Sequence, residues 1–104
     1  MNIQLHPEAE VELYEAAAWY DDQRPGLGGD LLAEMTRWLD VIAEAPWTWP
    51  KWPDAPDLDP PIRRVLTDRF PYAIAYQALF DRAWIIAFAH THRRPFYWAK
   101  RAVP

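Results

Sequence analysis

Six of the chain's eleven prolines fall within 16 consecutive residues, "PWTWPKWPDAPDLDPP" at positions 46–61. Proline has a fixed φ and no amide hydrogen, so this segment can form neither an α-helix nor a central β-strand. We expect an extended, semi-rigid connection whose tryptophans, Trp47, Trp49 and Trp52, pack against the rest of the protein. Regular structure must therefore form separately in the parts of the chain before and after it.

Helical periodicity dominates the part before this segment. Residues 2–5, "NIQL", are a candidate for a short strand, and Pro7 suits the first turn of a helix. From there, spacings of three and four place on one helix face Ala9, Leu13, Ala16 and Tyr20, and on another the acids Glu8, Glu12 and Glu15. The motif "RPGLGG" at 24–29 predicts a turn, after which a second helix ends before Pro46 and has an apolar side made of Leu31, Met35, Trp38 and Ile42. Two helices joined by a short turn are expected to form an antiparallel hairpin.

The part after the segment has the character of β-strands. Strands are predicted over 62–66, 72–79 and 84–90, and "FDR" at 80–82 joins the last two. Strand, helix, helix and three-strand meander together predict one α+β domain over residues 1–104. In this arrangement an antiparallel helix hairpin packs on one face of a mainly antiparallel sheet.

Cysteine and serine are both absent from the chain. Disulfides, thiolate metal sites and cysteine or serine nucleophiles are therefore excluded, and catalysis here would be general acid–base or electrostatic unless a threonine or a metal carried it. No apolar run approaches the ~18 residues of a membrane span. The acidic N-terminus "MNIQLHPEAEVELYE" has no signal-peptide features, so we expect a cytoplasmic protein that does not interact with membranes.

Charge is distributed unevenly along the chain. Residues 1–60 hold 13 acids and three bases, a net charge of −10, whereas residues 61–104 hold eight bases and two acids, a net charge of +6. Such asymmetry indicates that one part of the chain binds a polyanion or an acidic partner. The alternative for the acidic half is a simple solvated helix face.

The stretch "AFAHTHRRPFYWAKR" at 87–101 concentrates the polar candidates for a site. His90 and His92 have side-chain pKa values near ~6.5 when unperturbed and are suited to proton transfer. Their spacing places both on one face if the strand continues. A His-x-His motif also occurs in metal sites, but only His6 and the acids remain as further ligands, so we expect no metal and no other cofactor. The structural alternative for His90 is a packing residue at the strand end.

Four stretches in order, "LYEAAAWYDDQRPGLGGDLLAEM", "IRRVL", "RFPYAIAY" and "AHTHRRPFYW", resemble the RelE/ParE superfamily of toxins from bacterial toxin–antitoxin modules. The resemblance spans nearly the whole chain. It implies a growth-inhibiting toxin that is neutralised by a cognate antitoxin, in a complex of the two proteins. Some members of the family are ribosome-dependent mRNA endonucleases, whereas others bind and poison DNA gyrase without cutting RNA.

The nuclease members carry an arginine on the middle strand of the meander, directly after a tyrosine. Here that pair is Tyr72-Ala73, and alanine cannot hold a phosphate. The nucleases' arginine after the last strand falls on His92, with Arg94 two residues on, and their C-terminal tyrosine falls on Trp98, beside Tyr97. The resemblance therefore favours the ParE-like branch with DNA gyrase as the target.

The alternatives are a ribosome-dependent mRNA endonuclease, for which the catalytic candidates are His90, His92, Arg94 and Tyr97, and an inactive toxin-derived interaction module. Ribosome and mRNA would then replace gyrase as the target. Arg63 and Arg64 point to opposite sides of a strand, so one should join a basic face and the other should pair with an acid of the helix hairpin. The residues expected to bind an antitoxin or a target are Arg64, Arg93, Arg94, Trp98, Lys100 and Arg101.

Overall fold

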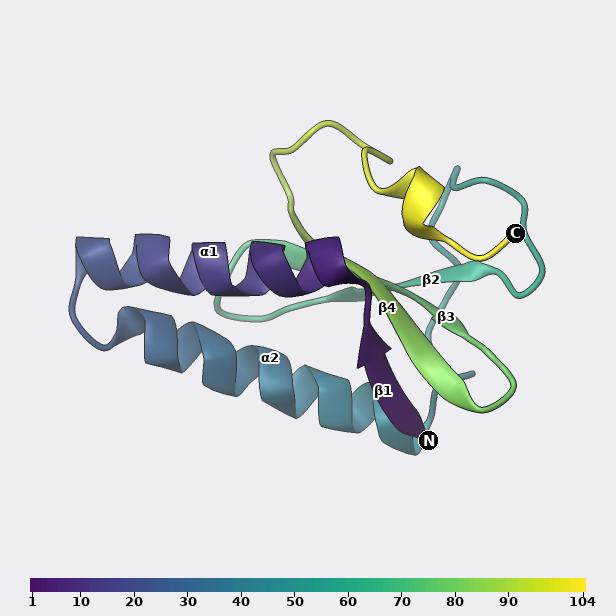
Figure 1. Ribbon diagram of the computed structural model, residues 1–104, viewed down its shortest axis with the longest axis horizontal. Coiled ribbons are helices and arrows are strands. Elements are labelled where there is room, and N and C mark those ends of the chain that lie inside the picture. Colours follow the sequence, from purple (N-terminus) through teal and green to yellow (C-terminus); the bar gives the residue numbers. More distant parts are fainter.

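The computed structural model describes all 104 residues, in the order strand, helix, helix, strand, strand, strand (Figure 1). The elements are β1 (Asn2–Leu5), α1 (Pro7–Gln23), α2 (Leu27–Glu44), β2 (Ile62–Leu66), β3 (Tyr72–Ala78), β4 (Arg82–His90) and a 3₁₀ helix, η1 (Ala99–Arg101). The strands form one sheet in the order β1-β4-β3-β2, in which β1 runs parallel to β4 and the other pairs are antiparallel. The predicted α+β class is confirmed.

The two helices approach closely where α2 begins. Gly26 has a φ of +91°, which turns the chain between the helices. A Cβ atom at Gly28 would overlap the carbonyl oxygen of Ala17, and the Gly28 amide donates to the Asp21 carboxylate at 2.8 Å. Gly28 therefore belongs to α2 and to the helix contact, not to the turn that the motif predicted. Neither helix has the length and apolar character that a membrane span requires.

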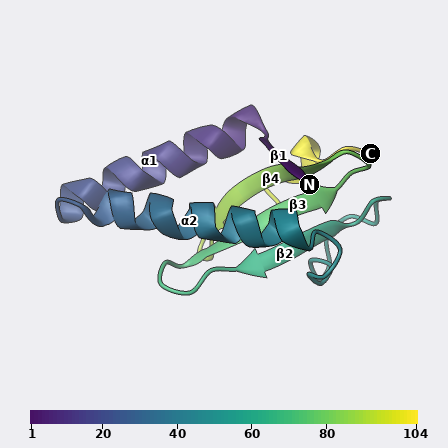
Figure 2. The same ribbon diagram turned by 90° about the horizontal axis from the view of Figure 1, so that it is seen from below.

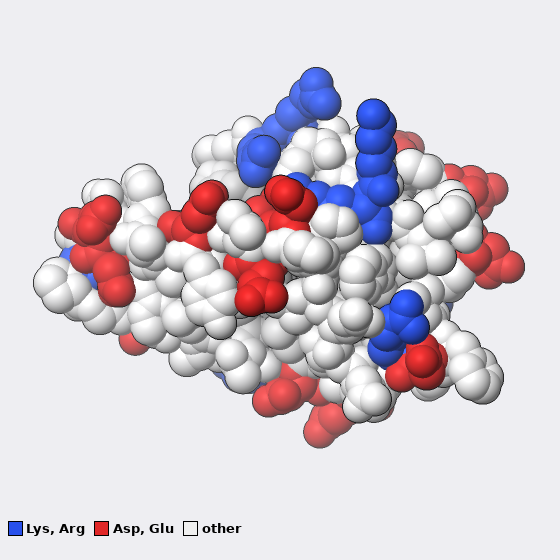
Figure 3. All heavy atoms as spheres, viewed as in Figure 1, with Lys and Arg blue, Asp and Glu red and all other residues white.

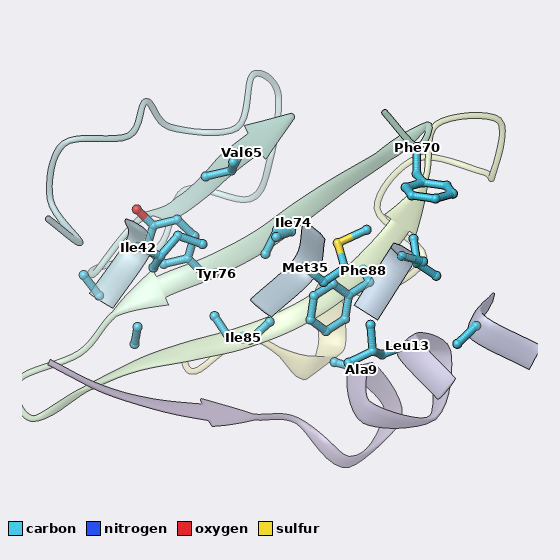
Figure 4. Close-up of a cluster of buried hydrophobic side chains, with 14 residues drawn as sticks. Ala9, Leu13, Met35, Ile42, Val65, Phe70, Ile74, Tyr76, Ile85 and Phe88 are labelled. Carbon is cyan, nitrogen blue, oxygen red and sulfur yellow. The ribbon is translucent and has the colours of Figure 1, made fainter. Parts of the chain in front are cut away.

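Both helices lie on the same side of the sheet, which we call the helix face (Figure 2). Between them and the strands lies a buried cluster, most of which Figure 4 labels. Its 14 members expose at most 8% of their surface: Ala9, Leu13, Ala17, Leu31, Met35, Ile42, Val65, Phe70, Ile74, Tyr76, Ala78, Ala83, Ile85 and Phe88. Both predicted apolar helix sides contribute to this core.

The opposite side of the sheet, the tail face, is covered by residues 52–61 and 91–104, whereas Trp49 packs against the cluster of the helix face. A second buried hydrophobic cluster lies there, and its six members are Ile62, Ala75, Ile86, Ala87, Ala89 and Trp98. Gln77, which is fully buried, donates to the carbonyl oxygens of Pro60 (3.0 Å) and Val103 (2.8 Å), and it accepts from the Val103 amide (2.8 Å). One side chain thus fixes both irregular segments to the sheet.

Several local expectations are wrong. Trp47 is 64% exposed and does not pack on the body, although Trp49 and Trp52 are partly buried as expected. Arg63 donates to the carbonyl oxygens of Trp47 (3.2 Å) and Trp49 (2.6 Å), at the start of the connection, and pairs with no acid of the helices. β4 begins at Arg82, two residues earlier than expected, because its first residues pair with β1.

Candidate functional site

A cavity of about 230 Å³ opens on the tail face beside the end of β4. Ala73 and Ala89, both in its lining, lie directly opposite each other on β3 and β4. Their short side chains leave space above the sheet that the irregular segments do not fill. We call this cavity the basic hollow; it is lined by Trp52, Arg64, Leu66, Ala73, Ala89, His90, Thr91, Arg93, Arg94, Pro95, Tyr97 and Trp98.

Two tryptophans from different segments form one wall of the basic hollow. Trp52 and Trp98 meet edge to face with ring centroids 4.9 Å apart, and Phe96 packs on Trp98 at 5.7 Å. Trp98 is only 1% exposed, so its ring fills the core of the tail face. Trp98 therefore lines the hollow but offers a partner almost no exposed surface.

Three arginines surround the basic hollow. The Arg64 guanidinium lies 5.5 Å from the Trp52 ring centroid, and that of Arg93 lies 3.9 Å from the Tyr97 ring centroid. No carboxylate lies within 4.0 Å of Arg64 or Arg94, whereas Arg93 is 3.7 Å from Glu12. The hollow therefore presents at least two positive charges that no acid of this chain neutralises.

Glu12 lies outside the hollow but contacts two residues of its lining, Tyr97 and Arg93, and sequence reasoning missed its role. Its carboxylate accepts hydrogen bonds from the Tyr97 hydroxyl (2.6 Å) and the Phe88 amide (3.2 Å), and it forms an ion pair with Arg101 (3.1 Å). The Phe88 amide needs this acceptor because β1 pairs with β4 only as far as Ile85. Glu12 thus joins α1, β4 and the C-terminal tail.

A signal for this role was present in the helix periodicity. Glu12 follows the buried Ala9 by three residues and precedes the partly buried Ala16 by four, so it lies at the border of the apolar side. Glu8 and Glu15, by contrast, are fully on the exposed side. An acid at such a border is placed to reach polar groups at the end of the sheet.

Tyr97 and Arg101 are committed to Glu12. Burial, and then the hydrogen bond to Glu12, raises the pKa of the Tyr97 phenol far above its ordinary value. A phenol held neutral in this way is a poor general base at physiological pH. The Arg101 side chain is 15% exposed and also donates to the Ile86 carbonyl at 3.3 Å. Its charge is neutralised within the chain, contrary to the expectation that it faces a partner.

The two histidines lie next to each other, but only one belongs to the hollow. His90 Nδ1 accepts the His92 amide at 3.1 Å, and the two ring centroids are 5.3 Å apart. The His90 ring also meets Tyr72 edge to face at 5.3 Å. Because β4 ends at His90, His92 lies in the following turn, is exposed and does not line the cavity.

The basic hollow thus brings together six of the predicted site residues: Arg64, His90, Arg93, Arg94, Tyr97 and Trp98. It leaves out His92, Arg101 and Lys100, the last of which is exposed on η1. Figure 3 shows acids spaced along α1 and cations standing above the tail. The acids of α1 are therefore separated from the cations of the tail except at Glu12, which pairs with Arg93 and Arg101. The acids Asp54, Asp57 and Asp59, by contrast, lie in the segment that covers the tail face.

No family model and no curated protein matches the sequence. Among solved structures, the fold is similar to a chain from the "Chromosomal ParDE TA system from P. aeruginosa", with a TM-score of 0.73 and 12% sequence identity. The likeness covers 88% of this chain and 97% of that chain. At this level of identity it establishes a shared fold, consistent with the α+β arrangement expected from the sequence, and the site must carry any statement about function.

Proposed function

We propose that this protein is the toxin of a toxin–antitoxin module, that it inhibits bacterial growth by binding DNA gyrase, and that a cognate antitoxin neutralises it. The similarity to a chain of a ParDE system supports the toxin–antitoxin part of the proposal. The unneutralised arginines Arg64 and Arg94 at the basic hollow are suited to an acidic partner, because guanidinium groups form paired hydrogen bonds with carboxylates.

The composition of the hollow favours binding over RNA cleavage. Phosphoryl chemistry requires a cation against the scissile phosphate. The floor of the cavity, formed by Ala73 and Ala89 on β3 and β4, carries none, and the cations Arg64, Arg93 and Arg94 stand around it. Tyr97, the tyrosine among the catalytic candidates, donates its hydroxyl proton in a hydrogen bond to Glu12. This cation-free floor is the observation that carries the proposal.

A second candidate function is a ribosome-dependent mRNA endonuclease. His90 lines the same cavity as Arg64 and Arg94, so a proton carrier and two cations are present. In that mechanism His92, Arg94 and Tyr97 would assist His90. The third candidate is an inactive interaction module. It would bind a partner through the same arginines but would have no effect on growth.

Inducible expression in a bacterial host distinguishes these functions. We expect growth arrest with DNA-damage signalling while mRNA stays intact, and loss of the arrest in the double variant Arg64→Ala, Arg94→Ala. Arg24→Ala is the matched control, because Arg24 is an exposed arginine at the turn between the helices. Cleaved mRNA that His90→Ala abolishes would favour the endonuclease, and unimpaired growth would leave only the inactive module.

Purified DNA gyrase provides the direct test of the target. We expect the protein to inhibit supercoiling or to trap cleaved DNA, and the double arginine variant to lose this effect. Growth arrest without any effect on gyrase would contradict the proposed target while leaving the toxin assignment standing. Co-expression with the product of a small neighbouring reading frame, where one exists, tests neutralisation by an antitoxin.

A further inference from the structure

The side of α1 that faces away from the sheet carries an apolar stripe. Pro7, Val11, Tyr14 and Ala18 are all exposed, Val11 by 49% and Tyr14 by 58%. A surface helix ordinarily places polar residues there. α2 follows that rule, since its apolar residues gather on the side toward the sheet, whereas α1 has apolar residues on both sides.

The spacing of this stripe is that of a coiled-coil seam. Successive members are four, three and four residues apart, as are the a and d positions of heptads. With Val11 at a and Tyr14 at d, the residues at b, c and f include Leu13, Ala9 and Ala16, which face the protein. We call Pro7, Val11, Tyr14 and Ala18 the α1 seam.

Acids flank the α1 seam at the positions that select a partner in coiled coils. Glu8 and Glu15 occupy e, and Glu10 occupies g. None of the three forms an ion pair within the chain. Glu10 and Glu15 also line a shallow groove with Pro7, Val11 and Tyr14, and Figure 3 shows uncharged surface between acids along this helix.

We propose that the α1 seam docks a helix of a partner protein whose own apolar seam is flanked by lysines or arginines. A second copy of this chain does not fit, because its seam would bring glutamates against glutamates. The α1 seam shares no residue with the lining of the basic hollow. The proposal is thus independent of the proposed function and gives the protein a second contact surface of opposite charge.

Designed helical peptides of about 21 residues test this proposal, since that length allows an isolated helix. The first has leucine at a and d and lysine at e and g; the second replaces those lysines by glutamate; the third is a scrambled version of the first. Calorimetry, with NMR of the labelled protein, measures binding. We expect the lysine-flanked helix to bind about tenfold or more tightly than either control, with NMR shifts centred on Val11 and Tyr14.

Two variants of the protein make the test specific. Val11→Gln, Tyr14→Gln should weaken binding of the lysine-flanked peptide about tenfold, and Glu10→Lys, Glu15→Lys should reverse the preference toward the glutamate-flanked peptide. All four positions are exposed, and circular dichroism checks the fold. Arg64→Ala, in the basic hollow, should leave binding unchanged.

Three results would overturn the proposal. The first is equal binding of the scrambled lysine peptide, which would indicate charge attraction alone. The second is unchanged binding to Val11→Gln, Tyr14→Gln, or no binding of the lysine-flanked helix at all. The third is a dimer of the protein in sedimentation experiments that this double variant dissociates, which would assign the seam to a second copy.

Discussion

The two faces of the sheet are covered by different means. On the helix face, two regular helices bury a continuous cluster of 14 residues. On the tail face, two irregular segments bury a cluster of six, and hydrogen bonds from side chains to the backbone hold them in place. The Gln77 side chain donates to the Val103 carbonyl oxygen and accepts from the Val103 amide. The Trp84 indole donates to the Arg101 carbonyl at 3.0 Å.

The difference teaches where this fold has room for a site. On the helix face the pocket of about 220 Å³ lies at the end of the sheet, between α1 and the side chains of Tyr72 and Phe88. On the tail face the irregular segments leave the gap above Ala73 and Ala89. Segments held by a few polar contacts also open at lower free energy than a packed helix layer. The tail face thus carries the unneutralised arginines, and the helix face supplies most of the stability.

The largest expected effect compares one buried isoleucine on each face. Ile74→Ala on the helix face should lower the free energy of unfolding by about 3–4 kcal/mol, because the helices cannot collapse into the cavity. Ile86→Ala on the tail face should cost about 2 kcal/mol, because the irregular segments can relax. Both wild-type residues are fully buried, so urea unfolding gives a matched comparison. Equal losses would mean that both covers are equally rigid.

The same contrast explains what could be predicted from the sequence. The helix face follows from periodicity: Leu31, Met35 and Ile42 repeat at helical spacing, and Ile74 and Tyr76 alternate with the residues of the other face. The parallel pairing of β1 with β4 lies outside such local patterns. Gly28 marks a helix contact that became visible only with both helices in place.

On the tail face the sequence indicates which polar residues lie near the hollow but not which groups they contact. Arg64 and Arg94 were expected to be available, and no acid neutralises them. Arg101 was expected to be available as well, but Glu12, which is 89 positions away, binds it. Such long-range polar contacts have no sequence period, so a sequence pattern cannot assign them.

The second prediction removes the charge that joins the tail to α1. Glu12→Gln keeps the shape of the side chain but leaves Arg101 without its anion in a largely buried position, which should cost about 2–3 kcal/mol. Hydrogen exchange should rise first in the tail and at the Phe88 amide. Glu15→Gln is the control: Glu15 follows Glu12 by three residues on the same helix and is exposed, so this change should alter the free energy of unfolding little. A loss spread evenly over the helix face would contradict the anchoring role.

The third prediction concerns alkaline pH, where buried tyrosines on both faces should lower stability. Burial raises the pKa of Tyr76 from 10.0 to about 12 on the helix face, and Tyr97 on the tail face is also raised. Above pH ~10 the unfolded chain releases these protons before the folded chain does, so the stabilisation is complete below pH ~10 and declines as pH rises. Each tyrosine should contribute a loss of about 1 kcal/mol per pH unit at most.

Denaturant unfolding at a series of pH values from 8 to 11 measures this decline. Tyr76→Phe should make the decline shallower by the share of one tyrosine, since it removes the titrating group. Tyr97→Phe should do the same if the tail stays docked. If it leaves the slope unchanged, the tail has already separated from Glu12 at that pH, and the tail face is the less stable cover.

The smallest effect on stability should accompany the largest effect on function. Arg64→Ala, Arg94→Ala removes two cations without an acidic partner, so the free energy of unfolding should change by only ~0.5–1 kcal/mol, mostly from the Arg64 contact with Trp52. Growth inhibition should nevertheless be lost. Arg101→Ala is the informative counterpart, because it should destabilise the tail through Glu12. If the double variant unfolds as readily as Arg101→Ala, the loss of inhibition would reflect loss of structure. The distinction between Arg101 as a stabilising residue and Arg64 and Arg94 as binding residues would then not hold.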